Sequence, residues 1–240
     1  MLTPGFHALW STPLAIFQNP LAALQHPVLI RALQALRLAQ CQQRGVATDQ
    51  PFFASDDDLL RRLQIAEGQE LVRFFVESLK ETITQANTRV APHTGATPWG
   101  SARRSMQIVI EGLWFQISRA GAFHDVHTHG NCSWSGVYVI QVDASPEREQ
   151  HPTYGVANGA TRFIGPYFQS LGGAHVDLGN AYLLPPQLDV APVAGQLIVF
   201  PAWLAHQALP YAGEAERIIL SFNASVHAAS GSDQLHRYGS

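Results

Sequence analysis

The chain has 240 residues, of which 46% are hydrophobic and 14% are charged, enough to bury the core of one domain. Its formal net charge is −3 and it has no extended Lys/Arg cluster, which argues against nucleic acid as a partner. The two cysteines, Cys41 and Cys132, predict neither a disulfide framework nor a zinc finger. The sequence begins without a basic, apolar leader and has no apolar run as long as a membrane helix, so we expect a cytoplasmic protein that does not enter a membrane.

The first hundred residues have the pattern of helices. Apolar residues recur at helical spacing in residues 20–41, 59–63 and 68–89, and the acidic run 56–58 suits the start of a helix. The Pro/Gly-rich stretch 91–100 then predicts a loop. We expect the helices to cover one face of a sheet, because a helical layer and a sheet can share one core.

From residue 106 onward the chain has the pattern of short strands separated by Gly and Pro. The predicted strands are residues 107–110, 113–117, 134–142, 161–164, 188–190, 196–200 and 218–222. Seven short strands of this kind predict a jelly roll. The expected fold is therefore mainly β with helices (α+β), in a single domain over residues 1–240. Within it, we expect residues 1–100 to be helical support, 101–228 the β core and 229–240 a tail.

Three histidines form the main candidate site. His127 and His129 are two residues apart, and positions i and i+2 of a strand point to the same face. His206 follows the apolar run 196–200, and a double-sheet fold can bring it beside this pair. A single buried histidine is more often an ordinary core residue than a ligand. Three that converge predict a metal centre. His124 has the opposite parity to His127, so we expect it to face away.

Arg217 begins the apolar strand that continues to Phe222. Strand alternation places Arg217, Ile219 and Ser221 on one face. A buried arginine is costly unless it meets an anion, and here the anion would be the carboxylate of a cosubstrate. The simpler alternative is a surface arginine paired with Glu214 or Glu216.

These residues belong to four short motifs. They are His-x-His at 127–129, Ser-Gly-Val-Tyr at 135–138, Phe-Pro followed by histidine at 200–206, and arginine followed by Ser-Phe-Asn at 217–223. Their order resembles the iron(II) and 2-oxoglutarate dependent oxygenases, and within them a bacterial and phage subgroup. The resemblance covers roughly residues 108–226.

The resemblance implies a double-stranded β-helix, which is a cupin-like jelly roll, with Fe(II) held by His127, His129 and His206. It also implies that Arg217, helped by Ser221, binds 2-oxoglutarate as cosubstrate. With dioxygen, oxidative decarboxylation of 2-oxoglutarate to succinate would be coupled to hydroxylation of a substrate.

The rest of the pocket is predicted from neighbouring residues. We expect Asn131 and Tyr138 to line it, and Trp134 to join them or to lie in the core. The loops at residues 143–159 and 165–186 are expected to shape specificity. The substrate is a small molecule or a peptidyl side chain, and a homodimer is compatible with the sequence.

The sequence also departs from the family pattern. Most of the superfamily has a carboxylate two residues after the first histidine, where this chain has His129. Either three imidazoles hold the metal, or Asp125, which shares parity with His127, supplies an oxygen ligand. The serine expected two residues after Arg217 is Ile219, which leaves Ser221 as the hydroxyl on that face.

Two other functions fit the same residues. The three histidines and the glycine and proline spacing around them overlap the cupin signature, and a three-histidine cupin can act as a dioxygenase without a cosubstrate. The cupin glutamate after His129 is missing, however, and such an enzyme has no need of Arg217. The other alternative is a non-catalytic jelly roll that binds a metal or a small carboxylate.

Overall fold

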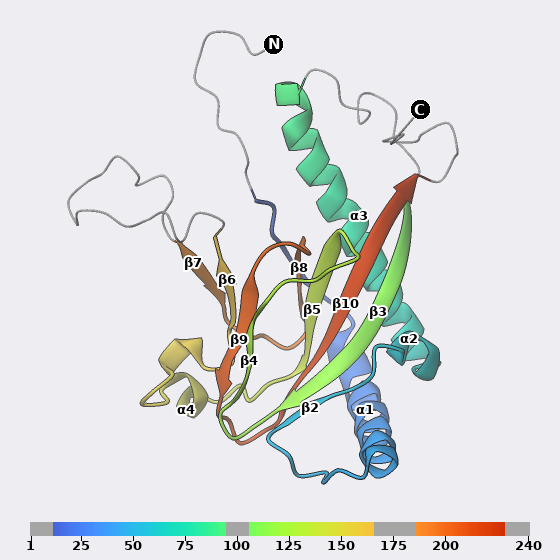
Figure 1. The fold of residues 1–240 in the computed structure, drawn as a ribbon. Coiled ribbons are helices and arrows are strands. Elements are labelled where there is room, and N and C mark those ends of the chain that lie inside the picture. The colour runs from blue at the N-terminus through green and yellow to red at the C-terminus, as the bar shows by residue number, and fades with distance from the viewer. Residues whose placement is uncertain (1–11, 95–105, 166–185, 229–240) are drawn as a thin grey trace, which may run out of the picture.

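Two antiparallel sheets face each other in the part of the chain that the structure describes, which comprises residues 12–94, 106–165 and 186–228 of this computed structural model (Figure 1). The six-stranded sheet has the order β1-β8-β5-β10-β3-β2, and the four-stranded sheet has the order β4-β9-β6-β7.

The strands are short in the four-stranded sheet and long at the centre of the six-stranded one. The strands are β1 (Ala15–Gln18), β2 (Phe52–Ala54), β3 (Met106–Ser118), β4 (Ala122–His127), β5 (Trp134–Gln141), β6 (Thr161–Ile164), β7 (Gln187–Val190), β8 (Gln196–Pro201), β9 (His206–Tyr211) and β10 (Arg217–Ala228). The helices are α1 (Ala22–Arg44), α2 (Leu59–Arg62), α3 (Ala66–Thr94), α4 (Pro146–Glu149) and the 3-10 helix η1 (Gly155–Ala157).

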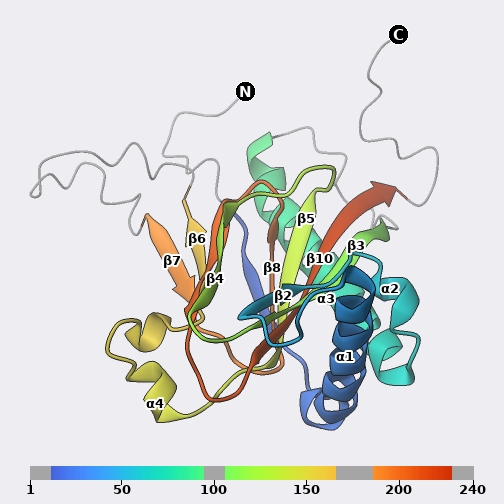
Figure 2. The same ribbon diagram turned by 60° about the horizontal axis from the view of Figure 1, so that its bottom comes forward.

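Helices α1 and α3 cover the outer face of the six-stranded sheet (Figure 2). Their buried leucines pack with Phe75 of α3 against Phe222 of β10 and Tyr138 of β5. The inner face carries a second, smaller apolar cluster that includes Val139 and Phe163 from the two facing sheets. The expectation of a mainly β protein with an N-terminal helical layer is confirmed. Among the described helices, none has the length and apolarity needed to cross a membrane.

The elements differ from the predicted ones at several places. Strands β1 and β2 come from the part predicted as helical, and they pair with β8 and β3 at the two edges of the larger sheet. Helix α3 continues through residues 91–94, which were predicted as loop, whereas residues 95–100 lie outside the described residues. Strand β3 is continuous where two strands were expected, because the extra residue Glu111 is accommodated as a bulge opposite Asn223 and Ala224.

Tyr138 lies on the helix side of the larger sheet and not in the predicted pocket. Its side chain is fully buried, and its hydroxyl accepts a hydrogen bond from Asn19 Nδ2 at 2.9 Å and lies 2.8 Å from His26 Nε2. Burial raises the pKa of Tyr138 to about 12, so the phenol stays protonated. The expectation that Tyr138 binds a cofactor is corrected, because alternation along β5 points it away from the facing sheet.

Replacing this hydroxyl should affect stability and leave the pocket unchanged. In Tyr138→Phe, Asn19 and His26 lose a buried partner, so the free energy of unfolding should fall by about 1–3 kcal/mol. Urea unfolding measures this change, and metal affinity should stay at the wild-type value. A loss of metal affinity with unchanged stability would contradict the assignment of Tyr138 to the core.

Candidate metal centre and adjoining pocket

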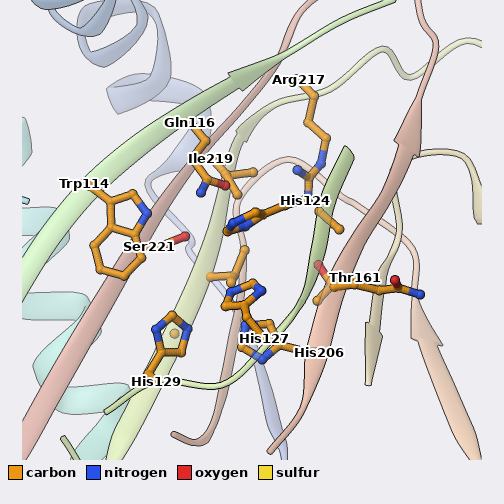
Figure 3. A pocket seen from close by; sticks show the side chains of 14 residues that line it. Trp114, Gln116, His124, His127, His129, Thr161, His206, Arg217, Ile219 and Ser221 are labelled. Atoms are coloured by element: carbon orange, nitrogen blue, oxygen red, sulfur yellow. The ribbon is translucent and has the colours of Figure 1, made fainter. Parts of the chain in front are cut away.

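Three imidazoles converge between the two sheets. His127 ends β4, His129 follows it, and His206 begins β9; one ligand atom from each lies within 4.8 Å of the others. Figure 3 shows the three rings gathered at one end of the pocket. The pairing of β4 with β9 sets His127 directly opposite His206, and the backbone N–H of His129 donates to the carbonyl of Ala202. Strand pairing therefore builds the cluster that the sequence predicted.

Backbone carbonyls set the tautomers of two of these rings. The Nδ1 atom of His127 lies 2.7 Å from the carbonyl oxygen of Asp125, and that of His206 lies 2.9 Å from the carbonyl oxygen of Leu204. Because a carbonyl oxygen only accepts, each Nδ1 carries the proton and donates. The lone pair of each Nε2 is then free for a metal.

Burial keeps His129 and His206 neutral. It lowers the pKa of His206 to about 3 and that of His129 to about 4, with smaller contributions from the neighbouring histidines. Unprotonated imidazole is the form that binds metal. At neutral pH, neither ring has to release a proton before coordination.

Asp125 does not join the cluster. Its side chain is exposed, and Oδ1 accepts a hydrogen bond from the backbone N–H of Val126 at 2.7 Å. Of the two alternatives left open by the sequence, the structure brings His129 to the other two histidines. The donor set contains three imidazoles and no carboxylate among the described residues.

Arg217 lies in the same pocket and has no ionic partner among the described residues. It is 2% exposed, and its Nε atom makes no hydrogen bond in the described part of the chain. Burial lowers its pKa to about 10, which still leaves it charged at neutral pH. The alternative of a surface arginine paired with acids is wrong, because Glu216 pairs with Arg37 and Arg217 faces inward. A buried cation without a partner favours binding of an anion.

The pocket runs from the histidines to Arg217. Arg217 is the one permanently charged side chain among the residues that line it, and most of the polar lining is neutral. Neutral hydrogen-bonding groups come from both sheets: Gln116, Thr161, Gln207 and Ser221.

Ser221 lines the pocket at the metal end. It pairs with Trp114 across β3, and the ring of Trp114 lies 5.9 Å from that of His129. Ser221 lies four positions after Arg217 in β10, which is about 13 Å along the backbone. The expectation that Ser221 assists Arg217 is corrected accordingly.

His124 also lines the pocket, contrary to its expected outward orientation. Its ring centroid lies 4.2 Å from that of His127. In the register of β4 with β9, His124 pairs with Ala208 and His127 pairs with His206, so three residues of β4 oppose two of β9. The extra residue of this bulge returns His124 to the inner face. The expectation that His124 faces away assumed a regular strand. No residue type within 122–127 indicates a bulge in the sequence.

Two other predicted lining residues lie elsewhere. Asn131 is exposed in the turn between β4 and β5, where it has a φ of 57°. Trp134 packs against the helix-side core. The short polar side chains missed by the sequence, Gln116 and Thr161, sit on inner positions of regular strands, and strand alternation within 113–117 and 161–164 is the signal that indicates them.

The end of the loop at residues 143–159 lies against Arg217. It is fastened by buried Arg148, whose guanidinium donates to the carbonyls of Asp143 and Asn158. A Cβ on Gly159 would lie 3.4 Å from Cδ of Arg217. The described geometry therefore makes this loop a closure behind Arg217. Of the other predicted specificity loop, residues 166–185 lie outside the described residues.

The metal-free protein should lose stability as the pH falls from about 6.5 towards about 4. In the unfolded chain histidine titrates near 6.5, whereas the folded pKa is about 3 for His206 and about 4 for His129. Between these values the unfolded chain binds more protons, so acid favours unfolding. Urea unfolding of the metal-free protein across this range measures the slope, which should be smaller in His206→Gln. An unchanged slope in that variant would contradict the low pKa of His206.

The comparisons with known proteins agree with this geometry. Residues 112–223 match the model of a family described as "Putative 2OG-Fe(II) oxygenase". No curated protein matches the chain. A prolyl hydroxylase from Trichoplax adhaerens, solved with a peptide of the hypoxia inducible factor oxygen degradation domain, is 11% identical. The match covers 90% of this chain and 84% of that one, with a TM-score of 0.50.

Two further solved structures align less closely in space. A prolyl-4-hydroxylase from Pseudomonas putida is 18% identical over 89% of this chain and 93% of that one, with a TM-score of 0.45. A 2OG-Fe(II) oxygenase family oxidoreductase from Burkholderia pseudomallei is 14% identical over 53% of this chain, with a TM-score of 0.34, and the match spans 48%, about half, of that protein. At 11% identity, the similarity to the Trichoplax adhaerens structure shows the fold alone. The family match contains all three histidines and Arg217, so residues 112–223, which hold the whole candidate site, are similar to the 2OG-Fe(II) oxygenases.

Proposed function

We propose that this protein is an iron(II) and 2-oxoglutarate dependent dioxygenase that hydroxylates a small-molecule or peptidyl substrate. The observation that carries the proposal is a pocket shared by a histidine cluster and a buried arginine that has no ionic partner among the described residues. A metal site alone fits many activities. A metal site that shares its pocket with a cation lacking an ionic partner favours a cosubstrate that binds metal at one end and carries a carboxylate at the other.

The donor set fits ferrous iron. Three neutral imidazoles are suitable ligands for iron, and also for zinc, copper and nickel, and they leave further positions of the metal for other ligands. When bound, iron supplies the activation of dioxygen, which amino-acid side chains cannot provide. The contribution of His127, His129 and His206 is to hold the metal at a fixed place between the sheets.

Arg217 fits the far carboxylate of 2-oxoglutarate. A guanidinium can bind a carboxylate through two parallel hydrogen bonds, and the absence of competing acids in the described pocket leaves its Nε free to do so. Burial strengthens this attraction because little water screens it.

The substrate would approach the metal beside Trp114 and Ser221. The cosubstrate would occupy the path from the histidines to Arg217, so the substrate would enter beside His129, where Trp114 and Ser221 lie. Neither side chain is charged. We therefore propose that the part of the substrate that reaches the metal is uncharged, with Trp114 offering a flat apolar surface.

A dioxygenase without cosubstrate is the second candidate, and the all-histidine donor set favours it. A dioxygenase without cosubstrate does not explain why Arg217 is buried, because a substrate chelated at the metal needs no second cation. A non-catalytic carboxylate-binding protein would use Arg217 but would not turn over.

Removing any one of the three histidines should weaken metal binding more than removing Asp125. Loss of a direct ligand should exceed the roughly 10- to 100-fold effect typical of groups that only support a ligand. Anaerobic Fe(II) or Co(II) titration of the three His→Ala variants measures this, with Asp125→Ala as the matched control. If Asp125→Ala loses as much affinity as His129→Ala, the three-imidazole site is wrong.

Replacing Arg217 should weaken the binding of 2-oxoglutarate and spare the binding of iron. Arg217→Met keeps most of the volume and removes the bidentate donor, so the Kd for 2-oxoglutarate should rise by at least about 100-fold. The readout is the visible charge-transfer absorption that 2-oxoglutarate develops on the Fe(II) protein without oxygen. Arg162→Met, which removes a half-exposed ion pair with Asp189, is the control and should bind normally.

Each outcome of this titration separates the candidates. Tight iron binding with no effect of 2-oxoglutarate on the wild type would favour the cosubstrate-free dioxygenase. Binding of 2-oxoglutarate without formation of succinate in oxygen, across candidate substrates, would favour the non-catalytic protein. Full binding by Arg217→Met would refute the assignment of the arginine.

A further inference from the structure

His124 occupies the space between the metal cluster and Arg217. Its ring lies in the pocket above that of His127, on the side towards the guanidinium (Figure 3). Phe52 of β2 contacts its far side, with ring centroids 5.9 Å apart. The ring is therefore held in place by two neighbours and does not hang free in the pocket.

The smaller sheet places a second polar group level with His124. In the register of the strands, His124 and Thr161 both pair with Ala208, one on each side of it. The neighbouring row of paired residues across β4, β9 and β6 that faces inward consists of His127, His206 and Phe163. His124 and Thr161 are thus one level removed from the metal towards Arg217. Because Ala208 between them is small, the space over it stays open.

Neither of these polar groups is used within the described residues. No hydrogen bond joins a ring nitrogen of His124 to another described residue, and the same holds for the hydroxyl of Thr161, which is 5% exposed. His124 is also not part of the three-histidine group whose ligand atoms lie within 4.8 Å. A half-buried imidazole facing a pocket without a partner lacks the hydrogen bonds that buried polar groups normally make.

We propose that His124, together with Thr161, donates a hydrogen bond to the far carboxylate of 2-oxoglutarate and so completes the anion site of Arg217. This inference rests on the proposed function and extends it to a residue outside the recognised motifs. Arg217 approaches the carboxylate from the larger sheet, and His124 and Thr161 approach it from the smaller sheet. The carboxylate has enough lone-pair sites to accept from all three.

The simplest alternative is a packing role, in which His124 only fills space between Phe52 and His127. Packing and hydrogen bonding respond differently to substitution. His124→Phe preserves an aromatic ring against both neighbours and removes the donor, whereas His124→Gln retains a donor and loses the ring. A packing role predicts that the phenylalanine variant binds normally, and the proposed role predicts that the glutamine variant does.

The test compares two ligands that differ only at the far end. 2-Oxopentanoate has the same chelating group as 2-oxoglutarate and a methyl in place of the far carboxylate. Anaerobic titration of the Fe(II) protein gives the Kd of each ligand in the wild type, His124→Phe, His124→Gln and Thr161→Val. Phe123→Ala, an exposed position on the other face of β4, is the matched control. Metal affinity is measured first, so that every comparison is made on fully loaded protein.

His124→Phe is expected to raise the Kd of 2-oxoglutarate by about 10- to 100-fold, the effect of one hydrogen bond to a charged group. The Kd of 2-oxopentanoate should stay at the wild-type value, and His124→Gln should recover most of the loss. Equal weakening of both ligands would overturn the proposal, because His124 would then act at the metal end. No weakening of either would also overturn it. Failure of the wild type to bind 2-oxoglutarate would instead refute the proposed function itself.

Discussion

The packing of α1 and α3 against the outer face of the larger sheet holds the pocket residues in place. Successive residues of β10 and β5 alternate between this apolar layer and the pocket, so a slip of one residue would exchange the two sets. Leu220 and Phe222 are fully buried against the helices, while Arg217 and Ser221 point inward. The fit is close: a Cβ on Gly136 would lie 2.4 Å from the ring of Phe222. Apolar burial on one face thereby determines where the polar groups stand on the other.

The smaller sheet brings together the histidines and Thr161, which come from different strands. Three of its strands, β4, β9 and β6, bring residues far apart in the sequence onto shared levels, one with His127 and His206 and one with His124 and Thr161. The bulge in β4 gives both histidines of that strand the same orientation although they are three residues apart. A regular strand would have turned His124 to solvent. The irregularity of one edge strand thus doubles the number of imidazoles that face the pocket from β4.

The charges of the pocket form a simple pattern. Burial keeps His129 and His206 neutral and leaves Arg217 as a cation without a described partner. A ferrous ion held by three imidazoles also carries one more unit of positive charge than one held by two imidazoles and a carboxylate. Both features favour a ligand with two negative groups. With a metal bound at the histidines, the two ends of the pocket would both be positive, as the proposed binding of a dicarboxylate requires.

The sequence by itself determined the residues whose roles depend on local pattern. The His-x-His spacing placed two imidazoles together, and the apolar strand after Arg217 indicated its inward orientation, because alternation follows from backbone geometry alone. The jelly roll followed from short strands separated by Gly and Pro. The same reasoning assigned Tyr138 to the pocket, because a motif shared with a family does not say which face of a strand a residue occupies.

Only the tertiary structure decided the features that depend on pairing between distant strands. The level shared by His124 and Thr161, the distance of Ser221 from Arg217 and the exclusion of Asp125 all follow from register, which is set by contacts across the fold. The edge strands β1 and β2 likewise form because the larger sheet offers them open hydrogen-bonding partners, and their own sequences show no strong strand pattern. Local alternation decides which residues share a face; register between strands decides which of those residues meet.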